Sequence, residues 1–204
     1  GRFSHGSLRN RESSPGIFLS THANRDTQER KETNMNVSEA IRSKRAVRQF
    51  ADQPLPEDTV RAILNAGRRA QSAKNIQPWH FIAIRQRSTL QALSQMGEWA
   101  GHLAGAALGV AIITPDPASR FSVMLDAGQA AAYMQLAAWE MGVGSCLATI
   151  YEPEQARQLL GFPPDMHLRI ALSFGYPLDA ALLSNPPKKG GRKGLDEVIH
   201  WDQW

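Results

Sequence analysis

Apolar residues recur at helical spacing in five stretches of the chain. The first stretch is short and follows Asn36, which can form a capping box with Glu39. The most apolar stretch, at about 122–141, carries apolar or small residues around most of its surface and is therefore predicted to be a central, buried helix. The other predicted helices begin near Pro56, Ser88 and Pro153.

Short apolar runs between these helices predict buried strands. Residues 81–84, 108–114 and 168–174 are rich in Ile, Leu and Phe and end at polar or turn residues. Residues 147–150 form another short apolar segment, which the pattern does not assign to a helix or a strand. No long repeat is present, and 204 residues are enough for one domain with a sizeable core.

The first 34 residues have a different pattern, dominated by polar and charged side chains. We expect an extension over 1–34 that is flexible or loosely draped, followed by the folded domain over 35–204. Met35 begins the organised part, so it is the expected native start. A basic arm that touches a partner subunit is the alternative interpretation of the extension.

Residues 42–50 combine cations with apolar anchors and read Arg-Ser-Lys-Arg-Ala-Val-Arg-Gln-Phe. The cations of interest are Lys44, Arg45 and Arg48. Val47 and Phe50 are expected to hold this segment against the core. Several fixed cations, with the bidentate geometry of arginine, suit a phosphate group. A solvated helix face is the alternative, because most charge runs lie at the surface.

Composition limits the classes of function. Hydrophobic residues make up 42% and charged residues 21% of the chain, and the net charge of +4 is compatible with an anionic cofactor. The basic residues form no long stripe, so we expect no nucleic-acid partner. Cys146 is the single cysteine, which excludes an internal disulfide and favours a reducing, cytoplasmic location with Cys146 as a small buried residue. No apolar run is long enough for a membrane span.

The sequence lacks the common catalytic and nucleotide-binding motifs. GxGxxG, GxxxxGK[ST], HExxH and GxSxG are all absent, and the six histidines have no metal-ligand spacing. We therefore expect no metal site and no catalytic side chain. Two separated basic clusters, at 42–50 and 186–193, instead predict a bound phosphorylated cofactor that carries the chemistry.

Two regions have less regular patterns. Residues 97–109 contain Trp99 and His102 among small residues. A ligand-facing segment is possible there, but packing is favoured for Trp99, and a surface position is favoured over substrate contact for His102. The tail from Leu178 onward is rich in turns and ends with apolar residues, for which another subunit is a natural place to be buried.

Four segments together resemble the shorter type of nitroreductase-like FMN flavoproteins. Residues 42–50 are similar to the opening Arg-Arg-Ser-x-Arg-x-Phe of that family, and residues 70–81 to its Ala-Pro-Ser-x-x-Asn-x-Gln-Pro-Trp-x-Phe. Residues 126–145 resemble its central helix, and residues 191–200 its C-terminal Arg-Lys-Pro-Leu-Glu-Glu. The resemblance covers the chain from Asn36 to the C-terminus.

This resemblance implies an α+β fold, with a mixed sheet flanked by helices, that forms an intertwined homodimer with two FMN sites. It implies that Lys44, Arg45, Ala46 and Arg48 hold the phosphate, ribityl chain and pyrimidine edge of FMN, and that Arg192 and Lys193 close on the phosphate. Residues of the other subunit would reach the ring: Gln71, Ser72, Ala73 and Asn75. Along the isoalloxazine would lie Leu147, Ala148 and Thr149.

The implied function is an FMN-dependent NAD(P)H oxidoreductase that reduces nitroaromatic, quinone or similar electron-poor small molecules by ping-pong hydride transfer through flavin N5. The sequence departs from the family pattern at Ala46, where Ser is usual, at Gln71, where Pro is usual, and at Gly194, which replaces the usual Pro. A flavin-binding or flavin-storing protein with poor turnover is therefore the alternative. A small basic nucleic-acid-binding protein is a third interpretation, supported only by the basic charge and the N-terminal arm.

Overall fold

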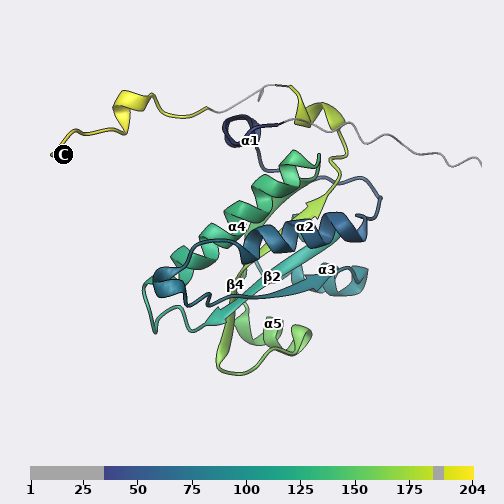
Figure 1. Cartoon of the computed structure of the whole chain (residues 1–204). Helices are drawn as coiled ribbons and strands as arrows, with labels where there is room; N and C mark the ends of the chain where they lie inside the picture. Colours follow the sequence, from purple (N-terminus) through teal and green to yellow (C-terminus); the bar gives the residue numbers. More distant parts are fainter. Residues whose placement is uncertain (1–34, 186–190) are drawn as a thin grey trace, which may run out of the picture. The chain divides into compact units, whose positions relative to one another are not determined.

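The computed structural model of the chain describes residues 35–185 and 191–204 (Figure 1). The described residues all belong to one compact unit. The expected extension at 1–34 and part of the second basic cluster, residues 186–190, lie outside the described residues.

The strands of the described chain form one antiparallel sheet. Its strands, β1 (His80–Ile84), β2 (Leu108–Pro115), β3 (Gly144–Thr149) and β4 (Met166–Gly175), lie in the order β1-β2-β4-β3. All three pairings are antiparallel, so the prediction of a mixed sheet is wrong for the strands of one chain. The one parallel contact among described residues is an isolated bridge, Ala46 to Ser145, which is a single contact and not a strand ladder.

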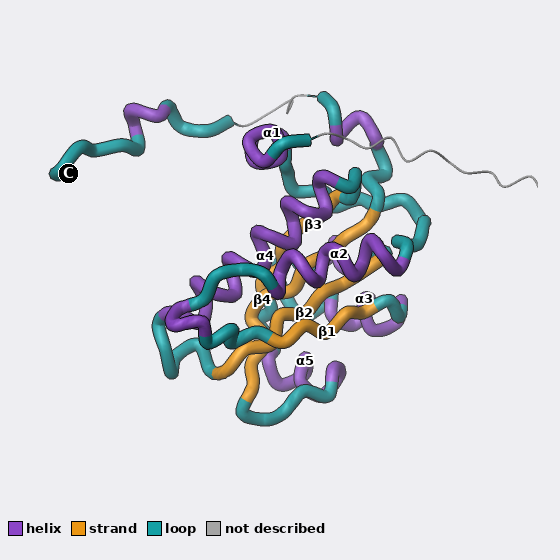
Figure 2. The backbone as a smooth tube through the Cα atoms, viewed as in Figure 1, coloured by secondary structure: helices purple, strands orange, loops and turns teal. Residues whose placement is uncertain are grey.

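Helices cover both faces of this sheet (Figure 2). The long helices α2 (Glu57–Arg68) and α4 (Ser122–Glu140) share an apolar core with one face, and α3 (Arg87–Leu93) and α5 (Pro153–Leu160) share a core with the other. The short helix α1 (Val37–Ser43) has the predicted capping box between Asn36 and Glu39. Single turns of 3-10 helix occur at Ala73–Asn75 (η1), Gly101–Leu103 (η2), Ala180–Leu183 (η3) and Leu195–Glu197 (η4).

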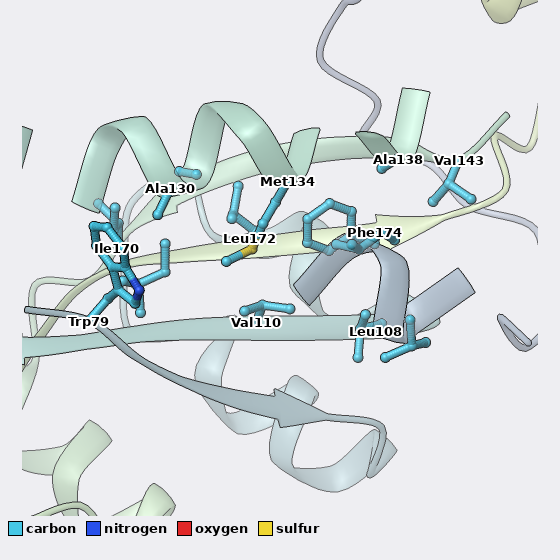
Figure 3. Close-up of a cluster of buried hydrophobic side chains, with 14 of the residues drawn as sticks. Trp79, Leu108, Val110, Ala130, Met134, Ala138, Val143, Ile170, Leu172 and Phe174 are labelled. Atoms are coloured by element: carbon cyan, nitrogen blue, oxygen red, sulfur yellow. The ribbon is translucent and has the colours of Figure 1, made fainter. Parts of the chain in front are cut away.

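Helix α4 packs across the middle of the sheet, as predicted (Figure 3). Met134 is fully buried among Val110, Leu172 and Phe174, and burial of such a side chain contributes about 1.5–3 kcal/mol. A Cβ on Gly67 would lie only 2.2 Å from Met134 Cε, so glycine allows α2 to approach α4 closely. The prediction of an all-round buried helix fails on the outer side, because Leu125 and Tyr133 are exposed in the described chain.

Two further predictions change with the structure. Residues 147–150 overlap β3, whose partner β4 is distant in sequence and therefore invisible to a local pattern. Trp99 is exposed rather than packed, since it lies in the turn before η2 while its small neighbour Ala100 enters the core.

Candidate functional site

The basic segment 44–48 follows helix α1 and lies at the edge of the sheet. Trp139 of α4 donates a hydrogen bond from Nε1 to Ser43 Oγ at 2.9 Å, which fixes the end of α1 against the C-terminal turn of α4. The Lys44 N–H then closes the helix on the Ala40 carbonyl, and the chain becomes extended. Val47 donates its backbone N–H to the Ser145 carbonyl at 2.9 Å, so this segment lies beside β3.

Two glycines permit this close approach. A Cβ on Gly144 would lie 2.7 Å from Val47 Cβ, and a Cβ on Gly175 would lie 2.9 Å from Phe50 Cδ1. Both distances are too short for real carbon atoms, so any larger residue would push the segment away from the sheet. Val47 is buried and Phe50 is half-buried, which confirms their predicted role as apolar anchors.

The cations at 44–48 do not lie on a solvated helix face. Lys44 and Arg45 are half-buried in the extended segment after α1, and Arg48 is exposed. Within the described chain none of the three makes an ion pair with an acid, whereas other arginines do, such as Arg61 with Glu57. Burial lowers the pKa of Lys44; the nearby Cys146 thiol opposes this change and the charge of Arg192 adds to it.

Strand β3 leaves an open edge next to these cations. The Leu147 and Thr149 side chains are exposed, 40% for Leu147, while Ala148 between them is buried. The Ser145 carbonyl faces segment 44–48, and backbone groups two residues apart point to the same side of a strand. The backbone N–H and C=O of Leu147 therefore also face away from β4, toward this open side.

The second predicted group lies elsewhere in the chain. Gln71 and Asn75 are exposed, and Ser72 and Ala73 are half-buried, in the turn that contains η1. The Ala73 N–H bonds to Asp126 near the start of α4, whereas α1 contacts Trp139 near its end. Thirteen residues of α-helix span about 20 Å, so the two groups lie at opposite ends of α4.

The structure thus brings some of the predicted residues together and not others. Segment 44–48 and β3 form one continuous surface, which contains Lys44, Arg45, Ala46, Arg48, Leu147, Ala148 and Thr149. Arg192 is exposed but close enough to influence Lys44, and Lys193 is exposed beside it. The group at 71–75 does not join this surface within one chain. The roles of all these residues toward a cofactor stay predictions.

A buried polar group behind β3 was not predicted. His102 is only 8% exposed, so the predicted surface position is wrong. Its Nδ1 lies 2.7 Å from Ser173 Oγ, which in turn lies 3.4 Å from the Cys146 carbonyl oxygen. Burial lowers the pKa of His102; the Leu147 carbonyl opposes this change and the charge of Arg48 adds to it. No local period in this loop marked His102 as a buried residue.

Cys146 is buried, as predicted. Burial raises the pKa of its thiol, against the opposing charges of Arg48 and Lys44. The thiol therefore stays protonated near neutral pH and is a poor nucleophile. Over residues 35–185 and 191–204, no three acids, histidines or cysteines come together in a way that could hold a metal ion. No helix in the same residues is long and apolar enough to cross a bilayer.

Comparison with known families gives this surface a context. The sequence model of the Nitroreductase family matches residues 41–176. The chain belongs to the nitroreductase family. The match begins within α1 and ends just after β4, so it includes segment 44–48, the turn at 71–75 and β3.

Individual relatives agree with this assignment. A provisionally named NADH dehydrogenase/NAD(P)H nitroreductase of Archaeoglobus fulgidus is 30% identical over 146 residues, which cover 68% of this chain and 84% of the relative. A protein of the same provisional name from Methanothermobacter thermautotrophicus is 26% identical over 181 residues, 85% of this chain and 91% of that one. The structure of an FMN-dependent nitroreductase from Clostridium difficile has a TM-score of 0.71 and 25% identity, and the match covers 81% of this chain and 98% of that one.

Proposed function

We propose that this chain is an FMN-dependent NAD(P)H oxidoreductase that reduces electron-poor small molecules such as nitroaromatics or quinones. The observation that carries the proposal is the cluster of Lys44, Arg45 and Arg48, which has no acidic partner among the described residues and borders the open edge of β3. The names of two similar proteins support it, because one refers to NAD(P)H and the other to FMN.

The residues at this surface fit an anionic cofactor. Burial is the main cause of the lowered pKa of Lys44, and the charge of Arg192 adds to it, so keeping this side chain charged costs the isolated chain free energy that a bound phosphate group would offset. In this proposal Lys44, Arg45 and Arg48 hold FMN with Arg192 and Lys193, and Leu147 offers its outward backbone N–H to the ring. When bound, FMN supplies the group that accepts a hydride from the nicotinamide and passes it to the acceptor.

The chain's own residues then bind and orient the cofactor rather than take part in covalent chemistry. Ala46 contributes its backbone alone at a position where a hydroxyl is usual, so the phosphate contacts depend more strongly on the neighbouring cations. Leu147 and Thr149 offer exposed side chains at the strand edge against which a flat ring can pack. No side chain near this edge is needed as a proton donor in this proposal, since solvent reaches the exposed strand.

We further propose that two copies of the chain form each site. The turn at 71–75 lies at the far end of α4 from segment 44–48, so one chain does not bring both groups to one ligand. A groove of about 550 Å³ between α1 and α4 is lined mainly by apolar residues. Val37 and Ile41 border it and are 71% and 63% exposed, which favours an interface between copies.

An absorbance spectrum of the purified protein tests the proposal first, followed by anaerobic addition of NADH or NADPH. Flavin bands that bleach with either nucleotide and return with a nitroarene or quinone are the expected result. Flavin that stays oxidised with both nucleotides would favour the alternative, a flavin-storing protein. The departures from the family pattern at Ala46 and Gln71 are compatible with that alternative. A colourless protein that does not bind added FMN would contradict the proposed function.

A further inference from the structure

The turn between α2 and β1 is held in an unfavourable backbone conformation. Lys74, Asn75 and Gln77 have φ values of 54°, 54° and 51°, and none of them is glycine. Left-handed backbone is costly for residues with a Cβ, so it persists only where surrounding contacts fix it. Three such residues within four positions indicate a loop whose shape is imposed by its contacts rather than by its own preference.

The contacts that fix this turn are of two kinds. Within the turn, the Gln77 N–H donates to Ser72 Oγ at 2.9 Å, and Gln77 Nε2 donates to Asn75 Oδ1 at 3.1 Å. From outside, the Ala73 N–H donates to Asp126 Oδ1 at 3.1 Å, across 53 positions of sequence. Among the described residues this is the one long-range side-chain hydrogen bond to the turn.

Asp126 is costly at this position. It is 2% exposed on α4, and its Oδ2 is buried without a hydrogen-bond partner in the described chain. The nearest cation is Arg120, whose Nη2 lies 3.9 Å from Oδ2 and 2.9 Å from Ser122 Oγ. A buried carboxylate with one hydrogen bond and one distant cation is a poor way to stabilise a helix, since an apolar residue would fill this core position without the cost of desolvation.

We infer that Asp126 is a positioning residue, which holds the turn at 71–77 in the shape required at the ligand site that this turn completes. The inference rests on the proposed function, in which the turn of one copy faces the FMN held by the other. Asp126 touches no cofactor in this account. It acts through the Ala73 N–H, and thereby places Ser72 and Asn75 before the ligand arrives.

A pair of substitutions separates the hydrogen bond from the charge. Asp126→Ala removes the acceptor, so the dissociation constant for FMN is expected to rise at least about tenfold, as loss of a hydrogen bond to a charged group implies. Asp126→Asn keeps an oxygen for the Ala73 N–H and is expected to stay within about threefold of the wild type. Asp116→Ala is the matched control, because the backbone N–H that Asp116 accepts, from Ala118 at 2.9 Å, lies in its own loop and not in the turn at 71–77.

Mixed dimers distinguish positioning from a general loss of stability. Chains with Arg48→Ala are paired with differently tagged chains that carry Asp126→Ala. If the turn of one copy serves the site of the other, one site in the mixed dimer carries both defects and the second carries neither. The expected result is one FMN per dimer, bound as tightly as in the wild type. A mixed dimer in which neither site binds FMN with wild-type affinity would overturn the inference. Asp126→Ala chains that bind FMN normally would also overturn it. The same holds for Asp126→Asn chains that bind FMN as weakly as Asp126→Ala chains.

Hydrogen exchange of the cofactor-free protein keeps this inference separate from the proposed function. Asp126→Ala should accelerate exchange of the Ala73 and Gln77 amides at least about tenfold, with the β2 and β4 amides unchanged. If the wild type fails to bind FMN, the proposed function is wrong, and this exchange result alone decides whether Asp126 positions the turn. Unchanged exchange at 73–77 would show that it does not.

Discussion

Arg48 links the exposed surface to the buried groups beneath β3. Its charge acts on both the Cys146 thiol and the His102 imidazole, while its own side chain is exposed. An arginine that is free of acids in the described chain and close to an open strand edge has its donors available for a ligand. The cluster could be predicted from sequence because cations and their spacing are local features.

Replacement of Arg48 with Ala should weaken FMN binding. A hydrogen bond to a charged group contributes about 1.5–3 kcal/mol, so the dissociation constant should rise roughly ten- to a hundredfold. The measurement is a titration of the cofactor-free protein with FMN, followed by the quenching of flavin fluorescence. Arg68→Ala is the control, since Arg68 is exposed on α2 and bonded to Asn65. Equal affinities for the two variants would remove Arg48 from the site.

His102 should make the stability of the protein depend on pH. Burial lowers the pKa of His102 in the folded chain, whereas the unfolded chain has an ordinary value of about 6.5. The unfolded state therefore binds the proton more readily. The contribution of neutral His102 to stability is fully present above pH 6.5, and it falls as the pH drops below 6.5 toward the pKa of His102 in the folded chain. His102→Gln should flatten this dependence in urea unfolding between about pH 5 and 8.

The exposed His80 provides the control for this measurement. His80→Gln makes the same substitution at this exposed position and shows what the loss of a surface imidazole does to the absolute stability. A His102→Gln variant with the wild-type slope would mean that other groups cause the dependence. The burial of His102 was out of reach of the sequence, because the loop around it has no helical or strand period that would define an inner face.

At the scale of elements, the packing of segment 44–50 against the sheet depends on contacts between residues that are distant in sequence. The capping box of α1 and the helix that follows Pro56 were predictable, since their signals lie within a few residues. The pairing of β3 with β4 and the bridge from Ala46 to Ser145 were not, because each joins residues far apart in the chain. The strand at 144–149 contains Gly, Ser and Cys as well as apolar residues, which explains why its pattern was weak.

Substitution of Gly144 directly tests the packing of segment 44–48 against β3. A methyl group added by Gly144→Ala would lie 2.7 Å from Val47 Cβ, so segment 44–48 must move away from β3. We expect FMN affinity to fall by about tenfold or more, because displaced cations no longer converge on one ligand. Gly105→Ala is the control, because Gly105 is exposed in the loop before β2 and a Cβ there meets nothing within 4 Å. Normal FMN binding by Gly144→Ala would mean that the bridge to β3 does not position the cations.

For the whole molecule, the outer face of α1 and α4 is the feature that one chain leaves incomplete. A central helix was predictable from its composition, but its exposed residues were not, since apolar side chains at a subunit interface look like core residues in a sequence. The C-terminal residues Leu195, Val198, Trp201 and Trp204 are likewise exposed in the described chain. Exposed apolar surface of this extent is unusual for a monomer.

Ile41→Glu should convert the proposed dimer into folded monomers that lack FMN. Ile41 is 63% exposed and lines the groove between α1 and α4, so a charge there costs the isolated chain little, within about 0.5 kcal/mol. Buried at an interface without a partner, the same carboxylate would be strongly unfavourable. Light scattering should report a single chain, circular dichroism a near-normal fold, and the absorbance spectrum no flavin. Gln91→Glu, which adds a charge to the exposed surface of α3, should remain a yellow dimer. Because the two groups of site residues lie at opposite ends of α4, a folded Ile41→Glu monomer that still binds FMN tightly would show that one chain is sufficient, and would refute the shared site.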